Sequence, residues 1–328
     1  MPPPVTRVVD EAGAWLPRRL GEVETVLREL LDGHGPALAA DAASTLAAGG
    51  KRLRPLLVLL CAGEGGGEAA VCAGAAVELV HMASLVHDDV LDDAPLRRGR
   101  PTVAASSGRG RATAAGDLLF SRAFALLAGN AQATAVELLS EASVSLALGE
   151  LAQRRDAHLI SIPAERYLER CRLKTASLFE CACLIGRAAP NVSGAGTEEA
   201  ASGELRAFGS EIGLAFQLLD DVLDVSGPPE RTGKARGTDL LDGTVTLPLI
   251  LAAERDPGLR AADLRGLDPA SAEVLCDRIA ATGALKEVRA RALRMVSEAK
   301  GRLVQPAFDE EARRLLGLVA DGVVERYA

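Results

Sequence analysis

The stretch that decides the fold is residues 68–93, EAAVCAGAAVELVHMASLVHDDVLDD, a long apolar run that ends in a block of acids. Ala and Leu favour helix, and the segments between Gly-, Pro- and Ser-rich breaks have helical periodicity, without a convincing alternating strand. Only 3% of residues are aromatic while 48% are hydrophobic, which favours aliphatic helices over a β-sandwich. We therefore expect an all-α fold, a single large helical bundle, with one domain over residues 1–328.

The composition excludes several classes of protein. The net charge is −8, from 37 Lys and Arg against 45 Asp and Glu, and the absence of long basic runs argues against nucleic-acid binding. We expect no membrane span, since no apolar stretch approaches the roughly eighteen residues needed to cross a bilayer. The start, MPPPVTRVVDEAG, lacks the apolar region of a signal peptide. We expect a cytoplasmic protein whose six cysteines are small buried thiols.

Two acidic clusters of the form DDxxD lie within apolar helical segments. They are Asp88, Asp89 and Asp92, and Asp220, Asp221 and Asp224. Residues four apart share one helix face, where like charges repel unless a counter-ion is present. One such cluster is commonly a solvated helix end or an N-cap. Two copies in apolar helices favour a site for hard divalent cations such as Mg²⁺, which complete their shells with phosphate oxygens and water. The implied ligand is a polyphosphate.

Two cationic segments accompany the acids. Residues 49–55, GGKRLRP, place three positive charges at the start of a helix, where the backbone N–H groups also favour anions. Residues 96–102, LRRGRPT, follow the first acidic cluster closely. Each segment alone would more often be solvated surface. Together with the acids they predict a pocket for two anions, one bound through metal and one directly by Arg and Lys.

These motifs, in this order, resemble those of the all-trans polyprenyl diphosphate synthase family. The resemblance covers nearly the whole chain, through residues 49–55, 78–102, 173–179 (LKTASLF), 216–227 (FQLLDDVLDVSG) and 232–239 (TGKARGTD). It implies an all-α bundle around a central cavity, a homodimer, and one aspartate-rich motif on either side of the opening. The implied activity is the transfer of an allylic chain from its diphosphate to isopentenyl diphosphate.

The resemblance also implies a role for individual residues. Isopentenyl diphosphate would be bound by Lys51, Arg54, His81 and Arg98. The allylic diphosphate would be contacted by Arg97, Lys174, Thr175, Gln217 and Lys234. The Mg²⁺ ligands would be Asp88, Asp92 and Asp220, with Asp89, Asp221 and Asp224 completing the clusters through water. The expected catalytic residues are Asp88, Asp92, Arg97, Lys174, Asp220 and Lys234.

Two positions need separate comment. On an apolar helix His81 alone would read as a core histidine, but it lies seven residues before Asp88 and so shares its helix face. Thr244 departs from the family pattern, because many relatives have a Lys there in a GKxTLP segment. Arg236 is the candidate that could replace this charge.

Product length depends on the depth of the cavity below the first cluster. Ser84 lies one helical turn, about 5.4 Å, below Asp88. Ala83 and Ser84 are small. Relatives that stop at fifteen carbons resemble this sequence except that they have bulky residues at these two positions. Val80, Phe120 and Phe124 would then set the floor, although both aromatic rings could equally be ordinary core. We expect a product of roughly thirty to forty carbons, with the twenty-carbon product as the alternative.

Three other classes are less consistent with the residues. A class I terpene cyclase also uses DDxxD and Mg²⁺, but it has no use for GGKRLRP, and its second metal motif is usually of an Asn/Ser/Glu type. A non-catalytic subunit of a heteromeric synthase would be expected to lose motif aspartates, and none is missing. A helical scaffold explains the fold but not the charges.

Overall fold

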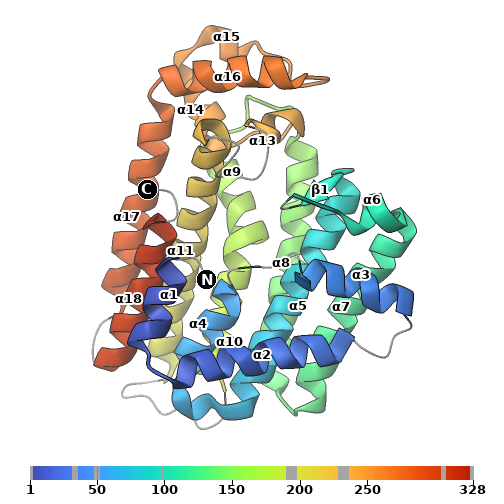
Figure 1. Cartoon of the computed structure of the whole chain (residues 1–328). Helices are drawn as coiled ribbons and strands as arrows, with labels where there is room; N and C mark the ends of the chain where they lie inside the picture. The colour runs from blue at the N-terminus through green and yellow to red at the C-terminus, as the bar shows by residue number, and fades with distance from the viewer. Residues whose placement is uncertain are drawn as a thin grey trace.

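The structure is a computed structural model that describes residues 3–31, 36–47, 50, 52–97, 99–189, 198–227, 236–303 and 308–325. It confirms the all-α fold, because long helices form one bundle (Figure 1). The elements are α1 (Pro3–Glu11), α2 (Trp15–Leu31), α3 (Pro36–Ala47), α4 (Leu53–Ala62), the 3₁₀ turn η1 (Glu64–Gly66), α5 (Gly67–Leu91), β1 (Leu96–Arg97), β2 (Arg100–Pro101), α6 (Val103–Ser107), α7 (Arg109–Gly129), α8 (Ala133–Asp156), α9 (Ala164–Cys171), the π-helical turn η2 (Arg172–Ala176), α10 (Ser177–Arg187), α11 (Glu198–Ser226), α13 (Thr238–Leu241), α14 (Leu247–Arg255), α15 (Pro257–Arg260), α16 (Pro269–Ala281), α17 (Ala284–Arg302) and α18 (Glu310–Glu325).

The central helix of the bundle is α5. Its residues 70–80 are all buried, as expected of a helix inside a core, and it packs against α2, α4, α7 and α10. The expectation that no stretch is long and apolar enough to cross a membrane was wrong. The span Glu64–Leu91 reaches a mean hydropathy of 1.8, but 78% of its most apolar window is buried inside the protein. Its length and apolarity therefore serve the core of the bundle.

The second long helix that carries an acidic cluster is α11. It packs against α10 and α17, and its residues Phe208, Ile212 and Ala215 are fully buried. In Figure 1 the C-terminal end of α11 lies near α13, at the same end of the bundle as β1, which follows α5. The fold therefore brings two clusters that are far apart in sequence to one end of the molecule.

A two-stranded hairpin, formed by β1 and β2, is the only β structure among the described residues. Leu96 pairs with Pro101, and Arg97 pairs with Arg100. Gly99 occupies the turn with φ of 75°, a conformation that favours glycine. Strands of two residues are too short to leave an alternating pattern, so the sequence predicted only a basic loop here.

Candidate active site

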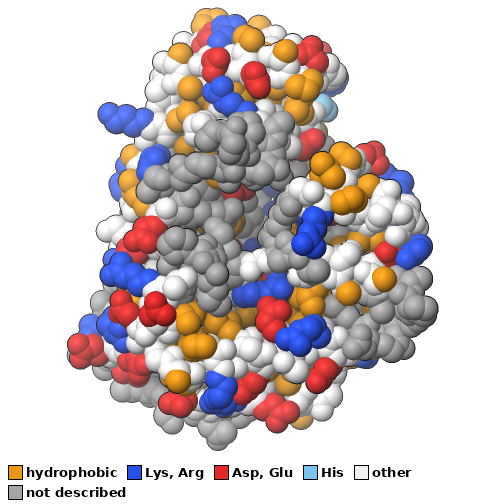
Figure 2. Space-filling view, in the orientation of Figure 1, with side chains coloured by type: hydrophobic (Ala, Val, Ile, Leu, Met, Phe, Trp, Pro, Cys, Tyr) orange, Lys and Arg blue, Asp and Glu red, His pale blue; other side chains and the backbone are white. Residues whose placement is uncertain are grey.

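Both acidic clusters contribute to one cavity of about 270 Å³. Figure 2 shows the surface hollowed between the part that carries β1 and α6 and the part that carries α13 to α16. Asp88 and Asp92 line the cavity from the α5 side, and Asp220 and Asp221 line it from α11. Four of the six motif acids therefore meet as the sequence predicted.

The other two motif acids do not line the cavity. Asp89 is 5% exposed, and its carboxylate accepts a hydrogen bond from Nε of Arg97 at 2.7 Å. This contact holds the hairpin against the C-terminal end of α5. Asp224 accepts a hydrogen bond from the backbone N–H of Asp239 at 3.2 Å. Both acids therefore anchor neighbouring chain segments.

Asp88 and Asp92 form one wall of the cavity, which we call the first wall. Nearby cations compensate the negative charge of this wall. Nζ of Lys174 lies 3.6 Å from Asp88 and also pairs with Glu150. The guanidinium of Arg154 lies 2.6 Å from Asp92 and 2.8 Å from Glu150. Glu150 therefore joins both cations. Sequence reasoning missed Glu150 and Arg154, although their spacing of four in a helix was visible.

Burial and these charges act in opposite directions on the pKa values of the first wall. Burial raises the pKa of Asp88, and the ammonium of Lys174 partly opposes that shift. Burial disfavours the charged form of Lys174, but Asp88 and Glu150 outweigh this and raise its pKa. Lys174 is thus held protonated beside the cavity.

Backbone packing sets the position of Lys174. It lies in η2, and π-helical turns are rare and frequent at functional sites. Gly149 of α8 faces this turn, and a Cβ at position 149 would lie 2.6 Å from the backbone nitrogen of Lys174. Glycine therefore permits the close approach that brings Glu150 within reach of Lys174.

Neutral donors hold the buried acid of α11. Asp221 is 2% exposed and accepts hydrogen bonds from the hydroxyl of Tyr167 and, at 2.8 Å, from Nε2 of Gln217. Gln217 in turn accepts from Thr175 at 2.8 Å. Burial, followed by the nearby charge of Asp239, raises the pKa of Asp221 well above its usual range. Thr175 and Gln217 line the cavity as predicted, and Tyr167 was missed.

Arg54 and His81 line the cavity as the sequence predicted. The guanidinium of Arg54 lies 4.6 Å from the centre of the Phe179 ring, and its buried Nε has no hydrogen-bond partner among the described residues. Burial lowers its pKa to about 10. A buried cation with an unused donor suits an anionic ligand. Lys51, Arg98 and Lys234, which were also predicted, lie outside the described residues.

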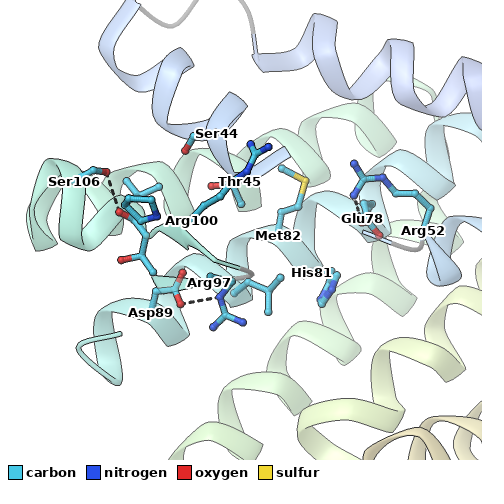
Figure 3. Close-up of a pocket in the computed structure, with 14 residues that line it drawn as sticks. Ser44, Thr45, Arg52, Glu78, His81, Met82, Asp89, Arg97, Arg100 and Ser106 are labelled. Carbon is cyan, nitrogen blue, oxygen red and sulfur yellow. Dashed lines mark hydrogen bonds and ion pairs between the residues drawn. The ribbon is translucent and has the colours of Figure 1, made fainter. Parts of the chain in front are cut away.

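Arg52 is directed away from Arg54. It has a left-handed backbone, with φ of 48°, and its guanidinium pairs with Glu24 and, at 2.8 Å, with Glu78. Figure 3 shows the Arg52–Glu78 pair and the Arg97–Asp89 pair on the walls of an adjoining cavity of about 310 Å³. His81 and Arg97 line both cavities.

The comparison with known proteins agrees with this arrangement. A model of the polyprenyl synthetase family matches residues 36–274, a range that contains both acidic clusters. The chain belongs to this family. It is a prenyltransferase, a polyprenyl diphosphate synthase.

Individual relatives match over most of their length. The chain is 41% identical over 241 residues to heptaprenyl diphosphate synthase component 2 of Geobacillus stearothermophilus, covering 73% of this chain and 74% of that protein. It is 38% identical over 297 residues to geranylfarnesyl diphosphate synthase of Aeropyrum pernix, covering 85% and 91%. A solved polyprenyl synthase from Caulobacter crescentus CB15, in complex with calcium and isoprenyl diphosphate, has a TM-score of 0.90 and 34% identity, covering 99% and 98%.

The position that departs from the family pattern, Thr244, lies in the cavity wall. Arg236 does not line the described cavity. Its guanidinium pairs with Asp277 at 2.6 Å and donates to the carbonyl of Val225. Asp239 and Asp242 line the same wall and were missed. They form a DxxD pattern, residues 239–242, which is a weak signal by itself.

The apolar part of the cavity only partly matches the predicted chain-length residues. Ser84 lines it as predicted. Val80 and Ala83 are fully buried and do not line it, and Phe120 stacks on His87 with the ring centres 5.7 Å apart. Phe124 is half-buried against the core. The apolar lining instead comes from Leu85, Leu146, Leu178 and Phe216.

Proposed function

We propose that this enzyme condenses isopentenyl diphosphate with an allylic diphosphate, in a Mg²⁺-dependent reaction, to make an all-trans product longer than fifteen carbons. One observation carries the proposal. A single cavity has acids and cations around Asp88 and Asp220, and an apolar lining at Leu146 and Leu178. Such a cavity suits a ligand with a diphosphate head and a hydrocarbon tail.

The donors in the cavity fit magnesium. Asp88, Asp92 and Asp220 would hold it, because carboxylate oxygens suit Mg²⁺, which keeps positions for phosphate oxygens and water. In the described part of the chain, no three acidic, His or Cys side chains converge into a ready metal site. Bound there, the ion would neutralise charge on the leaving diphosphate.

The side chains of this enzyme bind and orient the two substrates. Lys174 and Arg97 place positive charge where the allylic diphosphate departs, and by family resemblance Thr175, Gln217 and Lys234 share that contact. Arg54 and His81, with Lys51 and Arg98 by resemblance, hold isopentenyl diphosphate so that its double bond faces the allylic carbon. The apolar lining keeps water from the allylic cation. When the double bond of isopentenyl diphosphate attacks that cation, a new C–C bond and a tertiary cation form, and by family resemblance the tertiary cation loses a proton to the released diphosphate.

The product length rests on Ser84. Ser84 lines the cavity one turn below Asp88, where a small side chain would leave room for a growing chain. Relatives include heptaprenyl and octaprenyl diphosphate synthases, which supports a medium or long product of about thirty to forty carbons. A twenty-carbon product is the alternative, because solved geranylgeranyl pyrophosphate synthetases also share the fold.

We further propose a homodimer. Val144, Leu148 and Leu151 are spaced along one face of α8 and are 57%, 51% and 61% exposed. Large exposed aliphatic side chains in one stripe indicate an interface. Since the Geobacillus relative is called component 2 of its synthase, a different partner chain is the competing outcome. Light scattering of the purified chain, alone and with Leu148→Glu, distinguishes the two.

Two further expectations accompany the proposal. All six cysteines are free, five of them buried, which supports a reducing compartment such as the cytoplasm. The shared buried core supports one synthase domain over residues 1–328.

The proposed function is tested by incubating the purified chain with labelled isopentenyl diphosphate and farnesyl diphosphate. We expect Mg²⁺-dependent incorporation of label into an extractable prenyl chain, abolished by EDTA. Cyclisation of an allylic diphosphate without use of isopentenyl diphosphate would indicate a terpene cyclase. Inactivity of the chain alone, restored by a partner subunit, would overturn the proposal that it works as a homodimer.

A further inference from the structure

Glu78 of α5 is a buried acid to which the proposed reaction gives no part. Its side chain is 4% exposed, and its carboxylate accepts a hydrogen bond from Nη1 of Arg52 at 2.8 Å. It does not line the cavity of about 270 Å³, but it lines the adjoining cavity together with His81 (Figure 3). A buried carboxylate is costly unless cations compensate it. The cations around Glu78 therefore indicate what it does.

Glu78 stands on the face of α5 that is turned toward the start of α4. Four residues before it, a Cβ at Gly74 would lie 3.6 Å from Cα of Pro55, the third residue of α4. Three residues after it, His81 lines the cavity of about 270 Å³. Positions three and four apart share one helix face. Along α5, Glu78 is therefore placed between the contact with Pro55 and the cavity.

The turn that precedes α4 is held by this carboxylate. Arg52 has φ of 48° and ψ of 35°, a left-handed conformation that is uncommon for a residue with a side chain and persists where contacts hold it. Its guanidinium donates to Glu24 of α2 and to Glu78. The side chain of Glu24 is 33% exposed, whereas that of Glu78 is 4% exposed. Glu78 therefore fixes the turn from inside the protein.

The turn sends two arginines in different directions. Arg52 pairs with Glu78, whereas Arg54 lies over Phe179 and lines the cavity of about 270 Å³. Burial lowers the pKa of Arg54 to about 10, and the carboxylate of Glu78 opposes that shift. Because Glu24 also pairs with Arg52, that one cation does not cancel both acids. The charge of Glu78 thus also favours the charged form of Arg54.

We propose that Glu78 is a positioning residue for isopentenyl diphosphate. Its carboxylate fixes the turn at Arg52, and through that turn it directs the guanidinium of Arg54 into the cavity, where Arg54 meets the diphosphate. This inference rests on the proposed function, in which Arg54 binds isopentenyl diphosphate. The allylic diphosphate, which Lys174 would contact, does not depend on Glu78.

The first test replaces Glu78 by Gln and compares both substrates. We expect the KM for isopentenyl diphosphate to rise roughly tenfold, the loss expected for one charged hydrogen bond, while kcat and the KM for farnesyl diphosphate change less than about twofold. Glu78→Asp keeps the charge and should raise the KM for isopentenyl diphosphate less than Glu78→Gln does. An equal rise of both KM values would overturn the proposal.

The matched control is Glu24→Gln, which removes the other carboxylate of Arg52 and leaves Glu78 in place. It should change the KM for isopentenyl diphosphate less than about twofold. Equal effects of Glu24→Gln and Glu78→Gln would overturn the proposal, because they would show only a general loosening of Arg52.

A double-mutant cycle tests whether Glu78 acts through Arg54. In the Arg54→Met background, Glu78→Gln should raise the KM for isopentenyl diphosphate by less than about twofold, because no guanidinium is left to direct. A full tenfold rise in that background would overturn the proposal. If Glu78→Gln does not fold, Arg52→Met with Glu78→Gln removes both charges of the pair together and is measured in its place. The same tenfold rise is expected, and an unchanged KM would overturn the proposal.

A binding measurement separates this inference from the proposed function. Calorimetric titration of wild type and Glu78→Gln with isopentenyl diphosphate alone needs no turnover. We expect about tenfold weaker binding by the variant, and equal binding would overturn the proposal. A wild-type enzyme that binds isopentenyl diphosphate more tightly than Glu78→Gln does, but does not extend a prenyl chain, would overturn only the proposed function.

Discussion

The two acidic walls of the cavity are built differently although their sequences match. On the first wall, Lys174 and Arg154 lie beside Asp88 and Asp92, and Glu150 ties the two cations together. On the second wall, formed by α11 and α13, neutral donors, Tyr167 and Gln217, hold Asp221. The same DDxxD motif therefore yields one wall whose acids lie beside cations and one whose buried acid is held by neutral hydrogen-bond donors.

The largest effect is expected from removing a cavity carboxylate of the first wall. Asp88→Asn should lower kcat by at least about 10²-fold, because a preorganised charge at the reacting diphosphate is lost. Asp93→Asn is the matched control, since Asp93 is 80% exposed, pairs with Arg109 and does not line the cavity. Steady-state kinetics at saturating Mg²⁺ measure both. Equal activity of the two variants would contradict the assignment of Asp88.

A smaller effect is expected from Glu150, which holds the cations of the first wall. Glu150→Gln should lower kcat roughly tenfold, because Lys174 and Arg154 each lose a charged partner. The exposed Glu141 of the same helix offers the control Glu141→Gln. If kcat is unchanged in Glu150→Gln, the first wall does not depend on this compensation.

The depth of the cavity below the first wall is tested by the size of the product. Ser84→Phe should shorten the product while activity remains, because Ser84 lines the cavity one turn below Asp88. Phe120→Leu should leave product size unchanged, because Phe120 stacks on His87 away from the cavity lining. Chromatography of the dephosphorylated products measures both. A longer product from Phe120→Leu would place the floor at α7, as the sequence alone predicted.

The smallest effect is expected on the second wall. Tyr167→Phe removes one of the hydrogen bonds to the buried Asp221 and leaves that from Gln217. We expect the free energy of unfolding to fall by about 1 to 3 kcal/mol, with kcat reduced less than in Glu150→Gln. Denaturant titration gives the stability change. An unchanged midpoint would show that the hydroxyl does not support this wall.

The sequence predicted the fold and the charged residues that lie in its own motifs. The resemblance of the motifs to the family predicted that Asp88, Asp220, Arg54 and Lys174 surround one cavity, and all four line it. Glu150 and Tyr167 lie outside those motifs and could not be found in this way.

Those two residues act through contacts between helices that are distant in sequence. Glu150 reaches Lys174 only because Gly149 lets two backbones approach closely. The hydroxyl of Tyr167, on α9, donates to Asp221 of α11, a residue 54 positions away in sequence. Ala83 was wrongly paired with Ser84 as a lining residue, because neighbouring positions on a helix point about 100° apart.

The central claim is tested most directly by sizing the products formed by the wild-type chain. Purified enzyme, labelled isopentenyl diphosphate, farnesyl diphosphate and Mg²⁺ are incubated, and the products are dephosphorylated and separated by length. We predict all-trans chains longer than the fifteen-carbon primer, extending to roughly thirty to forty carbons because the small Ser84 lines the cavity one turn below Asp88. Recovery of only the fifteen-carbon alcohol would contradict the account.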